Sequence, residues 1–203
     1  MVDNMLSKIN FIGDWVIRLA YVNFLWIMFS AMGLFLLGIF PATAAMLTVI
    51  RKWLLKEHVS VFHTFKKSYR QAFTDANFVG WLLVIIGFFI YIDFIFLTSM
   101  NGIIFTILLF ILLSVSFIFL SIVIYIFPVY VHFQLKKLEY VKYAFIISLS
   151  YPHLTILMIL GAIVLIAVFI TFPLLFPFLL VSSLGCLTMY ISKRVFQKVG
   201  SSF

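Results

Sequence analysis

Charged residues are the scarcest feature of this sequence. Asp, Glu, Lys and Arg make up 10% of its 203 residues, whereas a soluble domain contains about 25%. Hydrophobic residues make up 66%, and the mean hydropathy is +1.26. Because so few charges cannot cover a surface that faces water, the composition excludes a soluble domain and predicts an integral membrane protein.

Cysteines and acids are also rare. Cys186 is the single cysteine, and because it lies in an apolar run we interpret it as a packing residue rather than half of a disulfide. The net charge is +8, from 14 Lys and Arg against 6 Asp and Glu. The basic residues lie between apolar runs, where membrane orientation explains them, and no nucleic-acid-binding module is present. The sequence therefore predicts no nucleic-acid partner.

The motifs of common membrane enzymes are missing as well. There is no H-E-x-x-H, no G-x-S-x-G and no Walker A sequence. Glu57, His58 and His63 are close in sequence but lack the i, i+4 spacing of a metal-binding pair on a helix. We therefore predict no enzyme activity, no metal site and no cofactor.

What the sequence does contain is three long apolar runs: 19–50, 76–135 and 143–192. A helix needs about 20 residues to cross a bilayer, so the second and third runs each predict a hairpin. Their turns are expected at 98–102, an Asn-Gly signal, and at 171–173, with Pro173 opening the next helix. Pro128 and Pro177 are expected to bend helices rather than to end them.

The first run is broken at GIFPATAAMLTVIRKW, residues 38–53. Gly38 and Pro41 predict a break in the backbone at or near the outer surface, which would make 1–60 an N-terminal hairpin with a short second helix, about 42–55. Small residues, Ala42 and Ala45, would allow close helix packing. We favour six crossings; the alternative is five, with 42–55 along the inner surface. A cleaved signal peptide is disfavoured because the apolar run is too long.

The basic residues predict the orientation. They gather in 51–75, in 132–142 and near the C-terminus, whereas the turns at 98–102 and 171–173 carry none. The positive-inside rule places the three basic segments, and hence the C-terminus, in the cytoplasm. Arg51, Lys52 and Trp53 would then form an anchor at the inner interface.

Two basic stretches are amphipathic. In the first, Lys66, Lys67 and Arg70 lie opposite an apolar stripe that consists of Phe62, Phe65, Tyr69, Phe73 and Ala76. In the second, the basic residues include Lys136, Lys137 and Lys142, and the apolar stripe consists of Leu135, Leu138, Val141 and Phe145. Each stripe would lie in the lipid of the inner interface or dock onto a partner protein; the pattern fits both.

Each amphipathic stretch leads into a predicted hairpin, and in both cases the lysine pair precedes the turn by 35 residues. This spacing hints at two parallel repeats. The predicted fold is therefore an all-α polytopic membrane domain, 1–203, with about six transmembrane helices and two cytoplasmic amphipathic helices. Its parts are the hairpin at 1–60 and the two helix-plus-hairpin units at 61–131 and 132–203.

Polar side chains inside the spans are few. Asn23 lies in the first run, and Asp93, in FFIYIDFIFL, is the single acid within a span. An intramembrane carboxylate is costly, so it suggests a partner. For Asp93 we consider a bonded or packed role, snorkelling to the outer interface, and ion or substrate coupling.

The run NFLWIMFSAMGLFLLGIFPATAAMLTVIRKWL, followed by VFHTFKKSYRQAF, resembles the YesL family, which is also called DUF624. The matching residues are Asn23, Trp26, Gly33, Gly38, Pro41, Ala42, Ala45, Arg51, Phe65 and Tyr69. The resemblance implies a multi-pass protein of the bacterial cell membrane, typically encoded beside carbohydrate ABC importers, and it supplies no catalytic residues.

Together these features predict a non-catalytic accessory subunit of an oligosaccharide ABC importer. It would lie in the lipid bilayer beside the permease subunits, with contact to an ATPase subunit as a further expectation. The alternatives are an independent small transporter or channel, with Asp93 near its pathway, and a membrane-bound regulator or assembly factor of sugar uptake.

Overall fold

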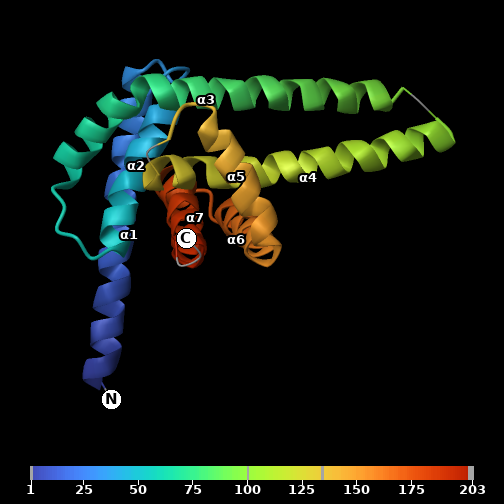
Figure 1. Cartoon of the computed structure of the whole chain (residues 1–203). Coiled ribbons are helices and arrows are strands. Elements are labelled where there is room, and N and C mark those ends of the chain that lie inside the picture. The colour runs from blue at the N-terminus through green and yellow to red at the C-terminus, as the bar shows by residue number, and fades with distance from the viewer. Residues whose placement is uncertain (1, 100, 134, 201–203) are drawn as a thin grey trace.

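The computed structural model describes residues 2–99, 101–133 and 135–200, and these ranges form helices joined by short connections. Met100, in a predicted turn, and Gln134, in the second amphipathic stretch, lie outside the described residues. The helices are α1 (Val2–Met32), α2 (Ile39–Leu54), α3 (Val61–Leu97), α4 (Ile103–His132), α5 (Glu139–Ser150), α6 (Pro152–Thr171) and α7 (Phe176–Gly200). The all-α prediction is confirmed (Figure 1).

Within the described ranges, five helices are long and apolar enough to cross a membrane. The candidate spans are Gly13–Met32, Val61–Leu97, Ile103–His132, Pro152–Thr171 and Phe176–Lys198. The helix α2 is missing from this set because its 16 residues extend about 24 Å at 1.5 Å per residue, which is less than the hydrocarbon thickness of about 30 Å. By length and composition, five helices therefore replace the six that the sequence favoured.

The helices α1 and α2 form an antiparallel hairpin. Near its open end the rings of Trp15 and Trp53 are 6.3 Å apart, and the Arg18 guanidinium lies 6.0 Å from the Trp53 ring. The two helices are joined by a turn at 33–38. Since α2 returns along α1, the structure has the hairpin that the sequence favoured, and the alternative of 42–55 as a separate helix along the inner surface is wrong.

The helix α2 lies in the core of the molecule. Half of its residues are buried: Pro41, Ala42, Ala44, Ala45, Met46, Leu47, Val49 and Ile50. They pack against Val22, Leu25 and Phe29 of α1, against Phe65 and Tyr69 of α3, and against Met189 of α7. Small side chains on α2 let these neighbours come close.

The two predicted amphipathic stretches become different elements. The first is continuous with the following span, so that α3 is one helix of 37 residues, which changes direction after its first turns (Figure 1). The second forms α5, which stops at Tyr151 because Pro152 lacks an N–H and disfavours helix at the residue before it. A single proline thus separates α5 from α6, and nothing comparable interrupts α3.

The proline predictions are partly wrong. The helix α4 continues through Pro128 to His132, as expected. The last connection, however, runs to Leu175, and α7 begins at Phe176. Pro177 therefore lies in the first turn of α7, where its missing N–H would have no partner anyway, whereas Pro173 lies in the connection.

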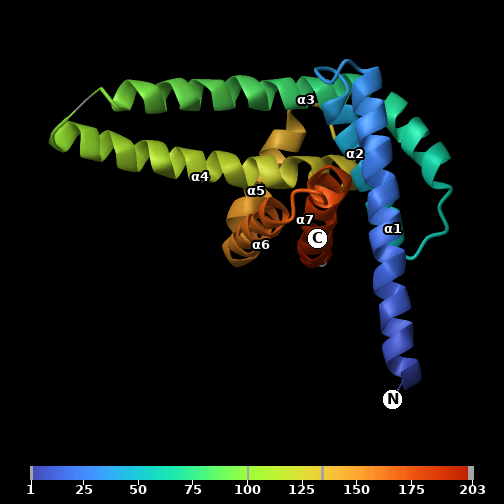
Figure 2. The same ribbon diagram turned by 180° about the vertical axis from the view of Figure 1, so that it is seen from behind.

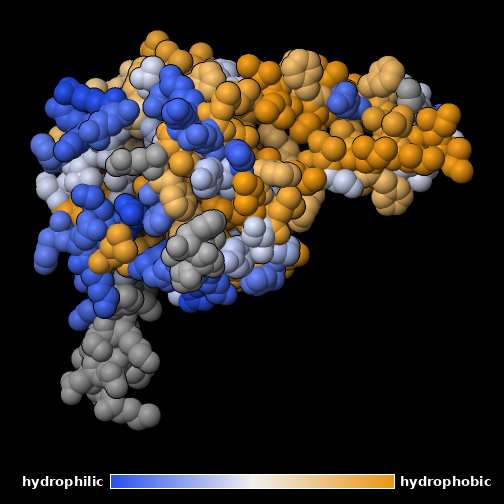
Figure 3. All heavy atoms as spheres, viewed as in Figure 1, coloured by the Kyte–Doolittle hydropathy of each residue, from blue (hydrophilic) through white to orange (hydrophobic). Residues whose placement is uncertain are grey.

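The far parts of α3 and α4, residues 84–120, form an arm that projects from the rest of the molecule (Figures 1 and 2). We call the remainder of the described chain the body. Most large apolar side chains of the arm are exposed, among them Phe89, Phe96 and Phe110. In the space-filling view the arm is mostly hydrophobic, while hydrophilic residues gather over the first part of α3 (Figure 3).

Candidate functional site

The residues that carry the family resemblance converge where α1, α2 and the first part of α3 meet. Gly38, Pro41, Ala42 and Ala45 are all buried there. The backbones of Gly33 and Gly38 nearly touch, because a Cβ on Gly33 would lie 2.4 Å from the Gly38 Cα. A Cβ on Gly38 would lie 2.3 Å from the Ser30 carbonyl oxygen. Any side chain at either position would therefore push α1 and α2 apart.

Asn23 joins α1 to α7. Its Nδ2 donates a hydrogen bond to the Pro177 carbonyl at 2.7 Å, and its Oδ1 accepts one from the Ser182 backbone N–H at 3.0 Å. The side chain is 1% exposed, so both bonds lie away from water. The sequence singled out Asn23 as an intramembrane polar residue, and the structure gives it a partner helix that is more than 150 positions away.

Two further polar links hold the same junction. Trp26 Nε1 donates to the Thr43 hydroxyl at 3.0 Å, which binds α1 to α2. Asn77 Nδ2 of α3 donates to the Leu37 carbonyl at 2.9 Å and to the Phe73 carbonyl at 2.7 Å. The sequence reading missed Asn77, although an amide at the start of an apolar run is the kind of group that links helices in membranes.

The first amphipathic stripe is used inside the protein. Phe65 and Tyr69 are buried, and their rings lie 5.1 and 5.0 Å from the Phe29 ring of α1. Ala76 is also buried, whereas Phe62 and Phe73 stay exposed. Neither lipid nor a partner reaches Phe65 or Tyr69 in this structure, so both expected uses of these two residues are replaced by packing on α1 and α2.

The second stripe is partly wrong. The buried face of α5 consists of Tyr140, Ala144, Ile147 and Ser148. Leu135 and Val141 of the predicted stripe are half-buried against the same cluster, whereas Leu138, just before α5, and Phe145 are exposed. Short helices with apolar residues on several faces give no unique period, so the packing of α4 decided the register.

The basic residues lie on the outside of this junction. Lys66, Lys67 and Arg70 are exposed on α3, opposite its buried stripe. Lys137 pairs with Asp75 of α3 at 3.2 Å and lies 5.6 Å from the Phe78 ring, so it ties the connection before α5 to α3. Lys136 donates its backbone N–H to the Glu139 carboxylate at 2.9 Å, which joins the connection to the first residue of α5.

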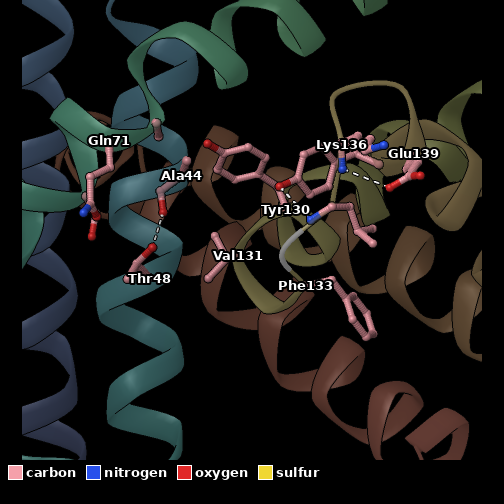
Figure 4. Close-up of a pocket in the computed structure, with 12 residues that line it drawn as sticks. Ala44, Thr48, Gln71, Tyr130, Val131, Phe133, Lys136 and Glu139 are labelled. Carbon is pink, nitrogen blue, oxygen red and sulfur yellow. Dashed lines mark hydrogen bonds between the residues drawn. The ribbon is translucent and has the colours of Figure 1, made fainter.

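Between these elements lies a hollow of about 710 Å³ (Figure 4). It is bordered by α2, the first part of α3, the end of α4 and the start of α5. Its polar lining consists of Thr48, Ser68, Gln71, Tyr130, Lys136 and Glu139. Because Gln71 also borders the basic surface formed by His63, Lys66, Lys67 and Arg70, the hollow and that surface form one continuous polar face, which we call the basic face.

The predicted interface anchor lies at the open end of the α1–α2 hairpin, where residues of α1 meet the end of α2. Trp53 packs on Trp15 and lies near Arg18, and Lys52 is 4.0 Å from Glu57. Lys193 of α7 donates to the Leu54 carbonyl at 2.9 Å, which satisfies an orphan carbonyl at the end of α2. Arg51 and Lys193 border the same small hollow near His132.

Asp93 lies on the arm, apart from the basic face. Its side chain is exposed, and no hydrogen bond or ion pair to another described residue holds it. Among the described residues no group of three or more His, Cys, Asp or Glu side chains is placed to hold a metal ion. The described site presents amides, hydroxyls and cations around a hollow, with aromatic rings packed beneath it.

The comparisons with known proteins agree with the resemblance. The family model described as "Protein of unknown function, DUF624" matches residues 19–94. Three proteins of Bacillus subtilis (strain 168) are similar to the chain. "Uncharacterized protein YteU" is 36% identical over 198 residues, which is 97% of this chain and 89% of YteU. No solved structure matches the chain.

The other two relatives cover somewhat less. "Uncharacterized protein YesL" is 35% identical over 80% of this chain and 77% of its own length. "Uncharacterized protein YesV" is 32% identical over 90% of this chain and 88% of its own length. At this identity and coverage, the chain belongs to the DUF624 family. The matched segment 19–94 contains the whole α1–α2–α3 junction described above.

Proposed function

We propose that this DUF624 protein is a non-catalytic accessory subunit of a carbohydrate ABC importer. It binds beside the permease subunits in the bacterial cell membrane, with its basic face and its C-terminus in the cytoplasm. The observation that carries the proposal is the arm, which belongs to two helices long and apolar enough to cross a membrane and whose large apolar side chains are mostly exposed. The resemblance supplies the identity of the partner, since it implies an association with carbohydrate import.

The arm has the properties of a surface made for other transmembrane helices. Phe89 and Phe110 are 61% and 67% exposed, so large aromatic side chains stand out from both helices. Helices associate in membranes through van der Waals packing, and large exposed rings offer much contact area. Of the most apolar part of each candidate span, 11% of the residues are buried in α4 and 17% in α3 and in α6, against 28% in α1 and α7.

The basic face supports the second part of the proposal. Its cations lie on α3 and beside α5, on segments that the positive-inside rule assigns to the cytoplasm. The hollow beside them is open and polar, which suits a protruding segment of an ATPase subunit or of a permease loop. The absence of a metal-binding group among the described residues is compatible with a role in binding.

Site-specific photocrosslinking in native membranes tests the proposal. A photoreactive amino acid replaces Phe89 or Phe110 on the arm, and the matched control carries it at Val164 of α6, which is 61% exposed. We expect a crosslink from the arm positions to a permease subunit and none from position 164. Crosslinks to lipid alone from all three positions, in membranes that contain an intact importer, would contradict the proposal.

A further inference from the structure

The turn between α1 and α2 has no polar side chain, a feature that the short connection at 172–175, FPLL, also shows. Residues 32–40 read MGLFLLGIF, and Met32, Leu34, Phe35, Leu36 and Leu37 are all exposed, Leu34 to 81%. By contrast, the connection after α2 contains Lys56, Glu57 and His58, and the one after α3 contains Thr98 and Ser99. A turn that faced water would not be expected to present four large apolar side chains in a row, 34–37.

The backbone of the turn satisfies its own hydrogen bonds. The N–H groups of residues 33 to 37 and of Ile39 all donate to backbone carbonyls, for example Phe35 to Ser30 at 2.8 Å and Leu37 to Gly33 at 3.1 Å. Leu34 and Phe35 adopt φ values of +55° and +59°, a region that non-glycine residues rarely occupy. This compact winding leaves no donor among these six groups for water to bind.

One side chain from outside the turn completes this pattern. Asn77 of α3 donates to the Leu37 carbonyl at 2.9 Å. In hydrocarbon, where water is absent, irregular backbone is tolerated when internal partners satisfy its polar groups. The six N–H groups named above and the Leu37 carbonyl meet this condition, the carbonyl through the Asn77 amide.

From these observations we infer that the turn at 33–38 lies within the hydrocarbon core of the bilayer, in contact with acyl chains. The pair α1–α2 is then a re-entrant hairpin, which enters and leaves on one side. The length of α2, 16 residues, suits a helix that does not cross, and α1, although long and apolar enough to cross, would then end within the bilayer. Fluid lipid is the fitting occupant because four successive side chains, 34–37, are exposed, whereas a single protein groove would meet one face. The inference concerns topology and does not depend on the proposed partner.

Spin labelling of the purified protein in liposomes tests the inference. In a Cys186→Ala background, a nitroxide is attached at Leu36→Cys, at Phe35→Cys as a second turn position, and at Ser99→Cys as the matched control in a polar turn. Collisions with oxygen, which concentrates in lipid, are compared with collisions with a water-soluble nickel chelate. At both turn positions we expect chelate collisions roughly tenfold below those at Ser99, and high oxygen collisions, since polar solutes are excluded from hydrocarbon.

Two results would overturn the inference. If the chelate reaches positions 35 and 36 as readily as position 99, the turn lies in water and the hairpin crosses the membrane. If neither oxygen nor the chelate reaches them, another copy of the chain covers the turn. Size-exclusion chromatography of each labelled variant, compared with the unlabelled protein, establishes that the turn is folded when it is measured.

Discussion

The arm belongs to more apolar helices than α1 and α7 of the body, and the two regions use their apolar side chains in opposite ways. In the body, Phe65, Tyr69 and the small residues of α2 are buried against one another, and amide side chains link helices that are far apart in sequence. In the arm, rings such as Phe89 and Phe110 remain exposed. In a bilayer, apolar composition alone does not decide between protein and lipid contacts, because lipid is as apolar as leucine. The difference lies in small residues and polar links, which are concentrated in the body.

The strongest test of this difference between the body and the arm adds one methyl group at the α1–α2 junction. In Gly38→Ala the new Cβ would meet the backbone of Ser30 at 2.3 Å, and backbone cannot move aside as a side chain can. We expect a loss of about 3 kcal/mol or more in the free energy of unfolding, seen as a lower midpoint of unfolding in detergent and reduced yield.

Gly87→Ala in the arm is the matched control. Its Cβ would lie 3.3 Å from the edge of the Phe119 ring, which can move slightly, and alanine favours helix. We expect a change within about 1 kcal/mol. Equal losses at both glycines would show that the arm is packed as tightly as the body.

A large-to-small substitution compares the two regions next. Phe65→Ala leaves a cavity beneath Phe29 and Tyr69, and we expect it to cost about 3 kcal/mol, the low end for a buried phenylalanine, because lipid is also an apolar environment. Phe89→Ala removes an exposed ring and should change the free energy of unfolding by less than about 0.5 kcal/mol. Unfolding in mixed micelles, followed by tryptophan fluorescence, measures both. A loss at Phe89 as large as at Phe65 would contradict the assignment of the arm as an unpacked surface.

Polar groups give the smallest expected effects. Asn23→Ala leaves the Ser182 N–H and the Pro177 carbonyl without their side-chain partner, at a cost of about 1–2 kcal/mol. Asp93→Asn on the arm removes a charge that no described residue pairs with. We expect an unchanged free energy of unfolding, and unchanged substrate uptake by liposomes into which the protein is reconstituted. Altered uptake in Asp93→Asn would favour the alternative of an independent transporter.

The sequence predicted the membrane class, the helical hairpins and the turn at 98–102, because long uncharged runs have one stable solution in a bilayer. It also identified Asn23, Gly38, Pro41, Ala42 and Ala45 as unusual, and all of them are buried in the body. It did not predict what they touch. Their partners lie on α1, α3 and α7, and the period of a single helix contains no information about distant helices.

Composition and charge by themselves therefore determined that the chain is an all-helical membrane protein and where its cations gather. The tertiary structure decided that the first amphipathic stripe packs on α1 and α2, that α5 turns a different face inward, and that an exposed arm remains. The physical reason is that an apolar side chain in a membrane protein has two favourable environments, lipid and protein. Close packing and polar links between helices choose between them, and these depend on three-dimensional neighbours.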